Sequence, residues 1–316
     1  MAALVSEYTL EFFTLLNARG KKELIEWCMK EGLIASSYEC PNCNEQMRLN
    51  ERKSVVLDGF EWRCRKKGVN AHDVCRSLRK NSWFSNSKLS MYDVLRVTKM
   101  WFGRCMNDYV VNELKLNINT VIDWFMFCRE VCMNAVVNES VKIGGVNVIV
   151  EIDESKFGKM KYGKGKPVDG KWVFGGIERG TNRCFFRVVE RRTKEELLCV
   201  IKEWVLPGST IVSDCWKAYK CLSDEGFKHL EVNHSVCFKD PDTGAHTNSI
   251  EGTWSAIKRF LRNHTSHAEG MFDHYLAEYL WRRSRDHSLS DETFRDFFKS
   301  CYYTLPSTWE GSTIRK

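Results

Sequence analysis

Residues 146–157 read VNVIVEIDESKF, a run of β-branched apolar residues that ends in three carboxylates. Valines at alternate positions predict a β-strand with those valines on one face and Glu151 and Asp153 on the other. Desolvating charge is costly, so the carboxylates at the end of such a strand need cations or a metal beside them, unless water reaches them. Composition alone favours a solvated strand end, but two stretches further along the chain favour a metal.

Length and composition restrict the class of protein. The chain has 316 residues, of which 43% are hydrophobic and 12% aromatic, as expected for a globular protein. The net charge of +7 suits a polyanionic partner if the charges cluster. No signal peptide and no membrane span are expected. Fourteen cysteines without an export signal indicate reduced thiols, some of them bound to metal, in the nucleus of a eukaryote or otherwise in the cytoplasm.

In the N-terminal half, the residue pattern predicts first helices, then short strands, and then helices again. Residues 4–33 predict two short amphipathic helices that are broken at 17–20. A polar, strand-like module with few core residues follows, and such a module usually needs a covalent or metal staple. From 89 to 137 the pattern predicts three helices, with Asn119 and Thr120 as a cap signal for the third. This layout fits a helix-turn-helix bundle that binds DNA, and it equally fits a plain three-helix connector.

The small module carries the cysteines with ligand spacing. Cys40-x2-Cys43 is a typical half-site for tetrahedral zinc, and Cys64 follows in the position of a second knuckle. The fourth ligand is either Cys75 or His72, and we favour Cys75. The alternative for the whole group is a set of buried thiols.

The segment from 141 to 285 alternates strands and helices. Three antiparallel strands, a helix, a parallel strand, a further strand and a helix form the order of a ribonuclease-H-like mixed sheet flanked by helices. In that fold the fourth strand pairs beside the first. The acidic ends of 146–157 and of the short strand that ends at Asp214 would then be neighbours.

Phosphoryl transfer by two divalent ions needs carboxylates that converge from several elements. Asp153 and Asp214 at adjacent strand ends would bridge Mg²⁺ or Mn²⁺, and Glu251 at the start of the next helix would supply a third carboxylate. Lys258 lies seven residues beyond Glu251, so the two side chains share a helix face and the lysine would grip a DNA phosphate. Taken singly, each acid has an ordinary explanation as a solvated strand end, a turn cap or a helix N-terminal charge.

Four stretches carry a family resemblance: EIDESKFGK, KWVFGGIER, SDCWKAY and HTNSIEGTWSAIKRFLR. They resemble the Merlin superfamily of DNA transposases and the bacterial ISXO-type insertion-sequence transposases, strongly over 146–285 and loosely over 35–140. The resemblance implies a ribonuclease-H-like fold in which an Asp-Asp-Glu triad, here Asp153, Asp214 and Glu251 followed by Lys258, cuts and rejoins DNA. It also implies a zinc ribbon upstream that recognises transposon ends.

Basic residues crowd the predicted active site. A lysine- and glycine-rich loop follows the first strand, and the helix that carries Glu251 continues with basic residues. Such a run is usually a solvated face, but beside a nuclease site contact with phosphates is the better interpretation. The residues expected to bind DNA are Lys156, Lys159, Lys161, Lys164, Lys258, Arg259 and Arg262.

These observations predict a metal-dependent DNA transposase that acts as a dimer or larger assembly on terminal inverted repeats and target DNA. We expect an N-terminal helical segment (1–34), a zinc ribbon (35–84), a helical DNA-binding region (85–140), a catalytic domain (141–285) and a C-terminal helical tail (286–316). The alternatives are a domesticated, non-catalytic DNA-binding protein, a structure-specific nuclease of the same fold, and a zinc-ribbon adaptor for other proteins.

Overall fold

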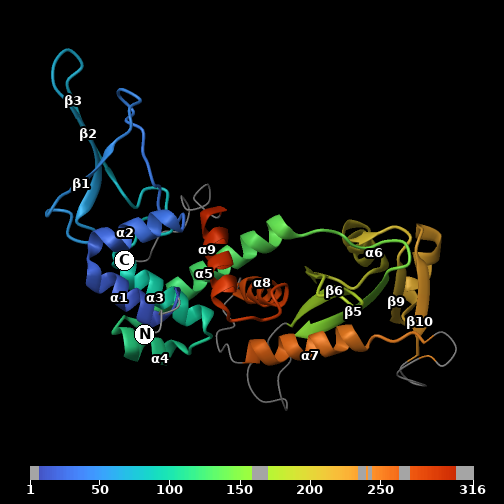
Figure 1. The fold of residues 1–316 in the computed structure, drawn as a ribbon. Helices are drawn as coiled ribbons and strands as arrows, with labels where there is room; N and C mark the ends of the chain where they lie inside the picture. Colours follow the sequence, from blue (N-terminus) through green and yellow to red (C-terminus); the bar gives the residue numbers. More distant parts are fainter. Residues whose placement is uncertain (1–6, 159–169, 234–239, 241–243, 263–270, 304–316) are drawn as a thin grey trace, which may run out of the picture. The chain divides into compact units, whose positions relative to one another are not determined.

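The computed structural model describes residues 7–158, 170–233, 240, 244–262 and 271–303 (Figure 1). The chain divides into two compact units. The first consists of residues 1–138 together with 288–316, and the second of residues 139–287. The second unit agrees closely in extent with the expected catalytic domain. The first unit combines segments that the sequence suggested were separate.

Six helices lie wholly or mainly in the described part of the first unit. Their bounds are α1 Leu10–Arg19, α2 Lys21–Lys30, α3 Met91–Phe102, α4 Asn107–Leu114, α5 Ile118–Glu139 and α9 Asp291–Tyr303. The two short N-terminal helices and the three later ones are therefore present as predicted. Gly20, at φ 137°, separates α1 from α2. The cap of α5 is Asn117, whose Oδ1 accepts the backbone N–H of Asn119 at 2.9 Å, so the cap lies two residues before the predicted one.

Helix α9 belongs to the core of the first unit, where the sequence suggested a separate C-terminal tail. Phe294, Phe297 and Phe298 are fully buried. The ring of Phe294 lies 4.9 Å from that of Phe102 in α3, and the ring of Phe297 lies 4.9 Å from that of Trp101. Aromatic residues spaced by three and four positions form one face of a helix, and this face is buried against α3.

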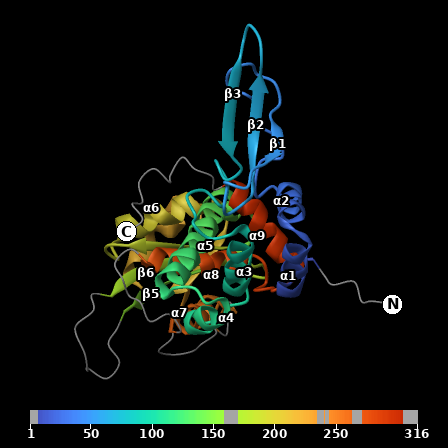
Figure 2. The same cartoon turned by 90° about the vertical axis from the view of Figure 1, so that its left-hand side faces the viewer.

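The small β module is a three-stranded antiparallel sheet in the order β1-β2-β3 (Figure 2). Its strands are β1 Arg48–Glu51, β2 Phe60–Lys66 and β3 His72–Ser77. A buried ion pair joins its loop to the segment that leads into α3. The guanidinium of Arg79 donates to both carboxylate oxygens of Asp58 at 2.7 and 2.6 Å, and also to the backbone carbonyls of Ser87 and Leu89.

Replacing Asp58 with Ala should lower the free energy of unfolding of the first unit by about 3–5 kcal/mol. The substitution leaves the Arg79 guanidinium buried without its counter-ion, which costs more than the pair itself contributes. Urea denaturation of Asp58→Ala and of the double variant Asp58→Ala/Arg79→Met would measure the effect. The double variant should recover part of the loss, and equal stability of wild type and Asp58→Ala would contradict the prediction.

The second unit is built on a five-stranded mixed sheet in the order β10-β9-β5-β6-β7. Strands β5, β6 and β7 are antiparallel, β9 runs parallel to β5, and β10 runs parallel to β9. Strand β9, the fourth long strand of the unit, therefore lies beside the first, β5, as predicted. The elements of the unit are β4 Ile143–Gly144, β5 Ile149–Phe157, β6 Lys171–Glu178, β7 Cys184–Val189, α6 Lys194–Trp204, β8 Val205–Leu206, β9 Thr210–Asp214, the 3₁₀ helix η1 Lys217–Glu225, β10 Lys228–Val232, α7 Asn248–Arg262 and α8 Met271–Arg283.

Two strand boundaries differ from the prediction. Strand β5 begins at Ile149 and not at Val146, because Gly144, Gly145 and Asn147 have positive φ angles and turn the chain just before it. The further strand, which the sequence predicts over 231–238, begins three residues earlier, at Lys228, as β10.

Helices cover both faces of the sheet, with α6 on one side and α7 on the other (Figure 1). On the α6 side, Val150 and Ile152 of β5 join one hydrophobic core with residues of α6 and η1. On the α7 side, Phe157 packs with Ile250, Trp254 and other residues of α7 and α8. The apolar residues of β5 therefore contribute to two hydrophobic cores, one on each face of the sheet.

Candidate active site and metal centre

The ends of β5 and β9 bring Asp153 and Asp214 side by side. The two strands pair in parallel, with Glu151 opposite Val212 as the last paired residues. Continuing that register by two residues places Asp153 beside Asp214 at the same edge of the sheet. The adjacency predicted from the strand order is therefore present.

Helix α7 supplies the third carboxylate and fixes the first. Glu251 lies in the first turn of α7 and accepts a hydrogen bond from the Thr247 hydroxyl at 2.9 Å. One turn further along, the indole Nε1 of Trp254 donates to Oδ2 of Asp153 at 3.0 Å. Trp254 is nearly fully buried, so this contact orients the Asp153 carboxylate from a rigid position.

The environment of Asp153 raises the pKa of its carboxyl group. Burial raises the pKa of Asp153 to about 6, the backbone N–H of Glu154 and the indole of Trp254 oppose the shift, and the negative charges of Asp214 and Glu251 add to it. Asp214 and Glu251 are thus both close enough to act on Asp153. Converging carboxylate oxygens of this kind fit a hard divalent cation, whose charge would relieve their repulsion.

The raised pKa makes the stability of the metal-free protein depend on pH. An unfolded aspartate titrates near pH 3.9, whereas Asp153 in the fold holds its proton up to about pH 6. The folded state therefore binds more protons between these values, and the free energy of unfolding should fall as the pH rises from about 4 to about 6. Thermal melts in EDTA should show that Asp153→Asn is more stable than wild type by about 1–2 kcal/mol at pH 7 and that the difference shrinks at pH 4.5. Equal melting temperatures at pH 7 would contradict this prediction.

The two other acids of VNVIVEIDESKF have separate environments. Glu151 is fully buried and its carboxylate contacts the N-terminal turn of α7, so it does not line the acidic edge with Asp153. Glu154 points to the α6 side, opposite to Asp153, as the alternation of the strand predicts. Burial raises the pKa of Glu154 to about 7.

The basic residues of α7 lie on its exposed side. Lys258, Arg259 and Arg262 are all exposed, and the Nζ of Lys258 lies 5.5 Å from the ring centroid of Phe157 in β5. Lys156 instead faces the α6 side, where its Nζ lies 5.8 Å from the ring centroid of Trp172. The predicted contacts of Lys159, Lys161 and Lys164 fall outside the described residues.

The prediction overlooked one cation on the α6 side. The guanidinium of Arg192 lies 3.9 Å from the ring centroid of Trp172 and 5.2 Å from that of Trp216. Trp216 follows Asp214 by two residues and donates its backbone N–H to Oδ1 of that aspartate at 3.1 Å. Arg192 lies between β7 and α6 in the sequence, and only the fold places it near the acidic edge.

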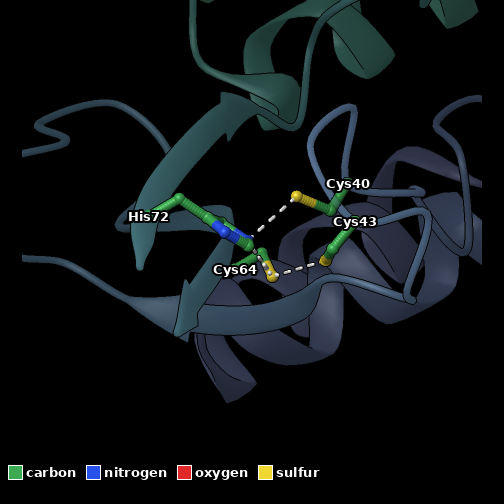
Figure 3. Close-up of side chains that lie close together, drawn as sticks. All are labelled: Cys40, Cys43, Cys64 and His72. Carbon is green, nitrogen blue, oxygen red and sulfur yellow. Dashed lines mark hydrogen bonds between the residues drawn. The ribbon is translucent and has the colours of Figure 1, made fainter. Parts of the chain in front are cut away.

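A second cluster forms in the β module of the first unit (Figure 3). Cys40 and Cys43 precede β1, Cys64 lies in β2, and His72 begins β3. Their ligand atoms all lie within 4.8 Å of one another, and in the described part of the chain no other group of three or more such residues meets this criterion.

His72, and not Cys75, completes the cluster. The Nε2 of His72 lies 3.5 Å from the sulfur of Cys40 and 3.4 Å from that of Cys64, whereas the Cys75 thiol donates to Glu61 at 3.4 Å. The reason is the register of the hairpin. Cys64 pairs with Val74, so even-numbered residues of β3 share its face and Cys75 points to the opposite one. The preference for Cys75 was therefore wrong, and the alternative that included His72 is the one the structure forms.

The donor set fits zinc. A tetrahedral ion with Zn–S near 2.3 Å and Zn–N near 2.1 Å requires sulfur–sulfur separations of about 3.8 Å and sulfur–nitrogen separations of about 3.6 Å. The Cys43 and Cys64 sulfurs are 3.7 Å apart, and the two sulfur–nitrogen distances are 3.4 and 3.5 Å. The Nδ1 of His72 donates to the carbonyl of Asn70 at 2.8 Å, which leaves Nε2 as the free lone pair facing the thiols.

The Cys40 thiol is prepared to bind as a thiolate. Burial acts to raise the pKa of Cys40, but the backbone N–H groups of Asn42 and Cys43 and the neighbouring thiols outweigh it, and the pKa is lowered to about 7. All described cysteines are free, so no disulfide competes for these sulfurs.

Comparisons with known proteins agree with the arrangement in the second unit. Residues 139–284 match the family model described as "ISXO2-like transposase domain". An "Uncharacterized transposase-like protein" of Haemophilus influenzae is 32% identical over 95 residues, which cover 30% of this chain and 76% of that protein. The helices of the described segments include none that is long and apolar enough to cross a membrane.

Solved structures give weaker likenesses. The catalytic core of BIV integrase has 12% sequence identity and a TM-score of 0.30, and the match covers 42% of this chain and 81% of that one. The catalytic core of HTLV-2 integrase in complex with magnesium has 15% identity and a TM-score of 0.29, over 44% and 88% of the two chains. The match to the family model and the 32% identical relative show that the chain belongs to the ISXO2-like transposase family.

Proposed function

We propose that the second unit cuts DNA at the ends of a transposable element and joins the freed ends to target DNA. The observation that carries the proposal is the convergence of Asp153, Asp214 and Glu251 from two strand ends and one helix, close enough to raise the pKa of Asp153. Acids gathered from separate elements at one partly buried edge are costly unless the site binds cations. The comparisons support a transposase, and within that class we infer a cut-and-paste enzyme of the Merlin type.

Each residue has a definite task in this scheme. Asp153, Asp214 and Glu251 would hold two divalent ions, with Asp153 kept in place by the Trp254 indole. When bound, Mg²⁺ or Mn²⁺ ions activate the attacking hydroxyl and stabilise charge on the scissile phosphate and the leaving oxygen. Lys258 would hold a phosphate next to the cleaved bond, and Arg259 and Arg262 would bind the DNA backbone along α7.

The first unit would supply recognition. The β module with its zinc site and the helices α3 to α5 would bind the terminal repeats, and two transposon ends would be held together by a dimer or larger assembly. Lys156 and the loop lysines 159, 161 and 164 would bind phosphates beside the active site.

A cleavage and joining assay tests the proposal. Labelled duplexes built from the sequences that flank the coding region would be incubated with the full-length protein in Mg²⁺, Mn²⁺ or EDTA. We expect metal-dependent nicking at the repeat end, and pre-cut ends should join to a target plasmid. Cleavage without joining would favour a nuclease, and tight specific binding without any product would favour a DNA-binding protein that has lost catalysis.

A further inference from the structure

Glu151 is a buried carboxylate that the proposed mechanism does not use. It is the third residue of β5, is fully buried, and lies two residues before Asp153. A carboxylate at such a position is retained only when several donors surround it. Its partners come from three separate elements of the second unit, and they all lie near the start of α7.

The first group of partners is the N-terminal turn of α7. Oε2 of Glu151 accepts the backbone N–H of Ser249 at 2.8 Å and that of Ile250 at 3.1 Å, and Oε1 accepts the Ser249 hydroxyl at 2.9 Å. The first backbone N–H groups of a helix have no partner within the helix, and a negative charge there is favoured by the helix dipole. Glu151 therefore caps α7 from a neighbouring strand.

The second group balances the charge. The guanidinium of Arg179, just after β6, donates to Oε1 of Glu151 at 2.9 Å and also to the backbone carbonyl of His246 at 2.8 Å. The Nδ1 of His246 lies 3.5 Å from the same oxygen. Arg179 thus ties the segment before α7 to the carboxylate that caps it.

The geometry points to Glu151 as a positioning residue that fixes the first turn of α7, and through it Glu251, against the strand that carries Asp153. Ile250, Trp254 and Ile257 hold the body of the helix by apolar packing, which is not directional. The hydrogen bonds of Glu151 are directional and end at residues 249 and 250, directly before Glu251. The inference rests on the proposed function only in assigning Glu251 to metal binding.

The test compares two buried glutamates. Glu151→Gln removes the charge and puts an amide N–H₂ among donors, so the start of α7 should loosen. Glu178→Gln is the matched control, because Glu178 is also buried and paired with an arginine, but its partners are Gly144, Thr181 and Arg183, away from α7. Mn²⁺ affinity, measured by the paramagnetic resonance of free Mn²⁺, and hydrogen exchange of the Ser249 and Ile250 amides are the readouts.

We expect Glu151→Gln to weaken Mn²⁺ binding by about tenfold or more, as loss of an outer-shell partner does, and to speed exchange at both amides. Glu178→Gln should change neither. Equal Mn²⁺ affinity in wild type and Glu151→Gln, or equal weakening in both variants, would overturn the inference. If Glu151→Gln does not fold, Ser249→Ala should weaken Mn²⁺ binding in the same direction, and an unchanged affinity would overturn the inference.

The outcomes separate this inference from the proposed function. A wild type that binds Mn²⁺ more tightly than Glu151→Gln but never cleaves DNA would support the positioning role and remove the proposed activity. If the wild type and Glu151→Gln both cleave DNA and require the same Mn²⁺ concentration, the proposed activity is supported and the positioning role of Glu151 is refuted. Absence of Mn²⁺ binding by the wild type would overturn both.

Discussion

Asp153→Asn should reduce metal-dependent strand cleavage by at least about a thousandfold. A bound divalent ion contributes several kcal/mol of transition-state stabilisation, and each 1.36 kcal/mol is about a factor of ten in rate. The amide of asparagine keeps an oxygen for the Trp254 indole, so the side chain should stay in place while its charge is lost. Asp214→Asn and Glu251→Gln should have similar effects.

The measurement is single-turnover cleavage of a terminal-repeat duplex at saturating protein. Asp224→Asn is the matched control, because Asp224 is an exposed aspartate of η1 in the same unit and should retain full cleavage. Affinity for the duplex should be preserved in all variants. Because Asn at 153 is expected to stabilise the metal-free fold, lost activity would not reflect unfolding. Metal-dependent cleavage by Asp153→Asn within tenfold of wild type would refute the assignment of this residue.

The sheet and the acidic edge could be predicted because their signals are local and ordered. A β-branched run, a Gly-containing turn and a capped helix are each visible within about fifteen residues, and their order fits few topologies. Thr193, a residue type that commonly caps helices, accepts the backbone N–H of Glu196 at 3.3 Å at the start of α6. Once the order is known, Asp153 and Asp214 must be neighbours.

The role of Glu151 could not be predicted in this way. Its partners Arg179, His246 and Ser249 lie 28, 95 and 98 residues further along the chain (179 − 151, 246 − 151 and 249 − 151) and belong to separate segments. No spacing rule joins residues that meet only after the sheet and α7 have packed. The sequence indicates at most that a carboxylate inside an apolar strand requires partners.

The error over the fourth zinc ligand has a different cause. Cys75 was preferred on residue type, whereas strand register decides which side chain faces Cys64. Because β2 and β3 pair residue 64 with residue 74, His72 lies on the diagonal from Cys64 and Cys75 does not share that face. The length of the hairpin loop, which sets this register, was not visible from the cysteine spacing.

Removal of zinc should unfold the β module and leave the second unit intact. The module buries few apolar residues, among them Trp62 and Met47, so it cannot offset the entropy of ordering its chain unaided. A structural zinc site contributes about 10–16 kcal/mol of binding free energy at neutral pH, far more than the stability of a domain of this size. Cys64→Ser should therefore abolish zinc binding and unfold the β module, so that its backbone amides exchange with solvent.

Two matched variants decide which residues form the site. His72→Ala should lose bound zinc as Cys64→Ser does, whereas Cys75→Ser should retain one zinc per chain, because its thiol contacts Glu61 on the other face of the hairpin. Zinc content by elemental analysis and hydrogen exchange across residues 40–77 would show both effects. Retention of zinc by His72→Ala together with its loss from Cys75→Ser would refute the assignment. Since the second unit has its own core, its melting transition should be the same in all three variants.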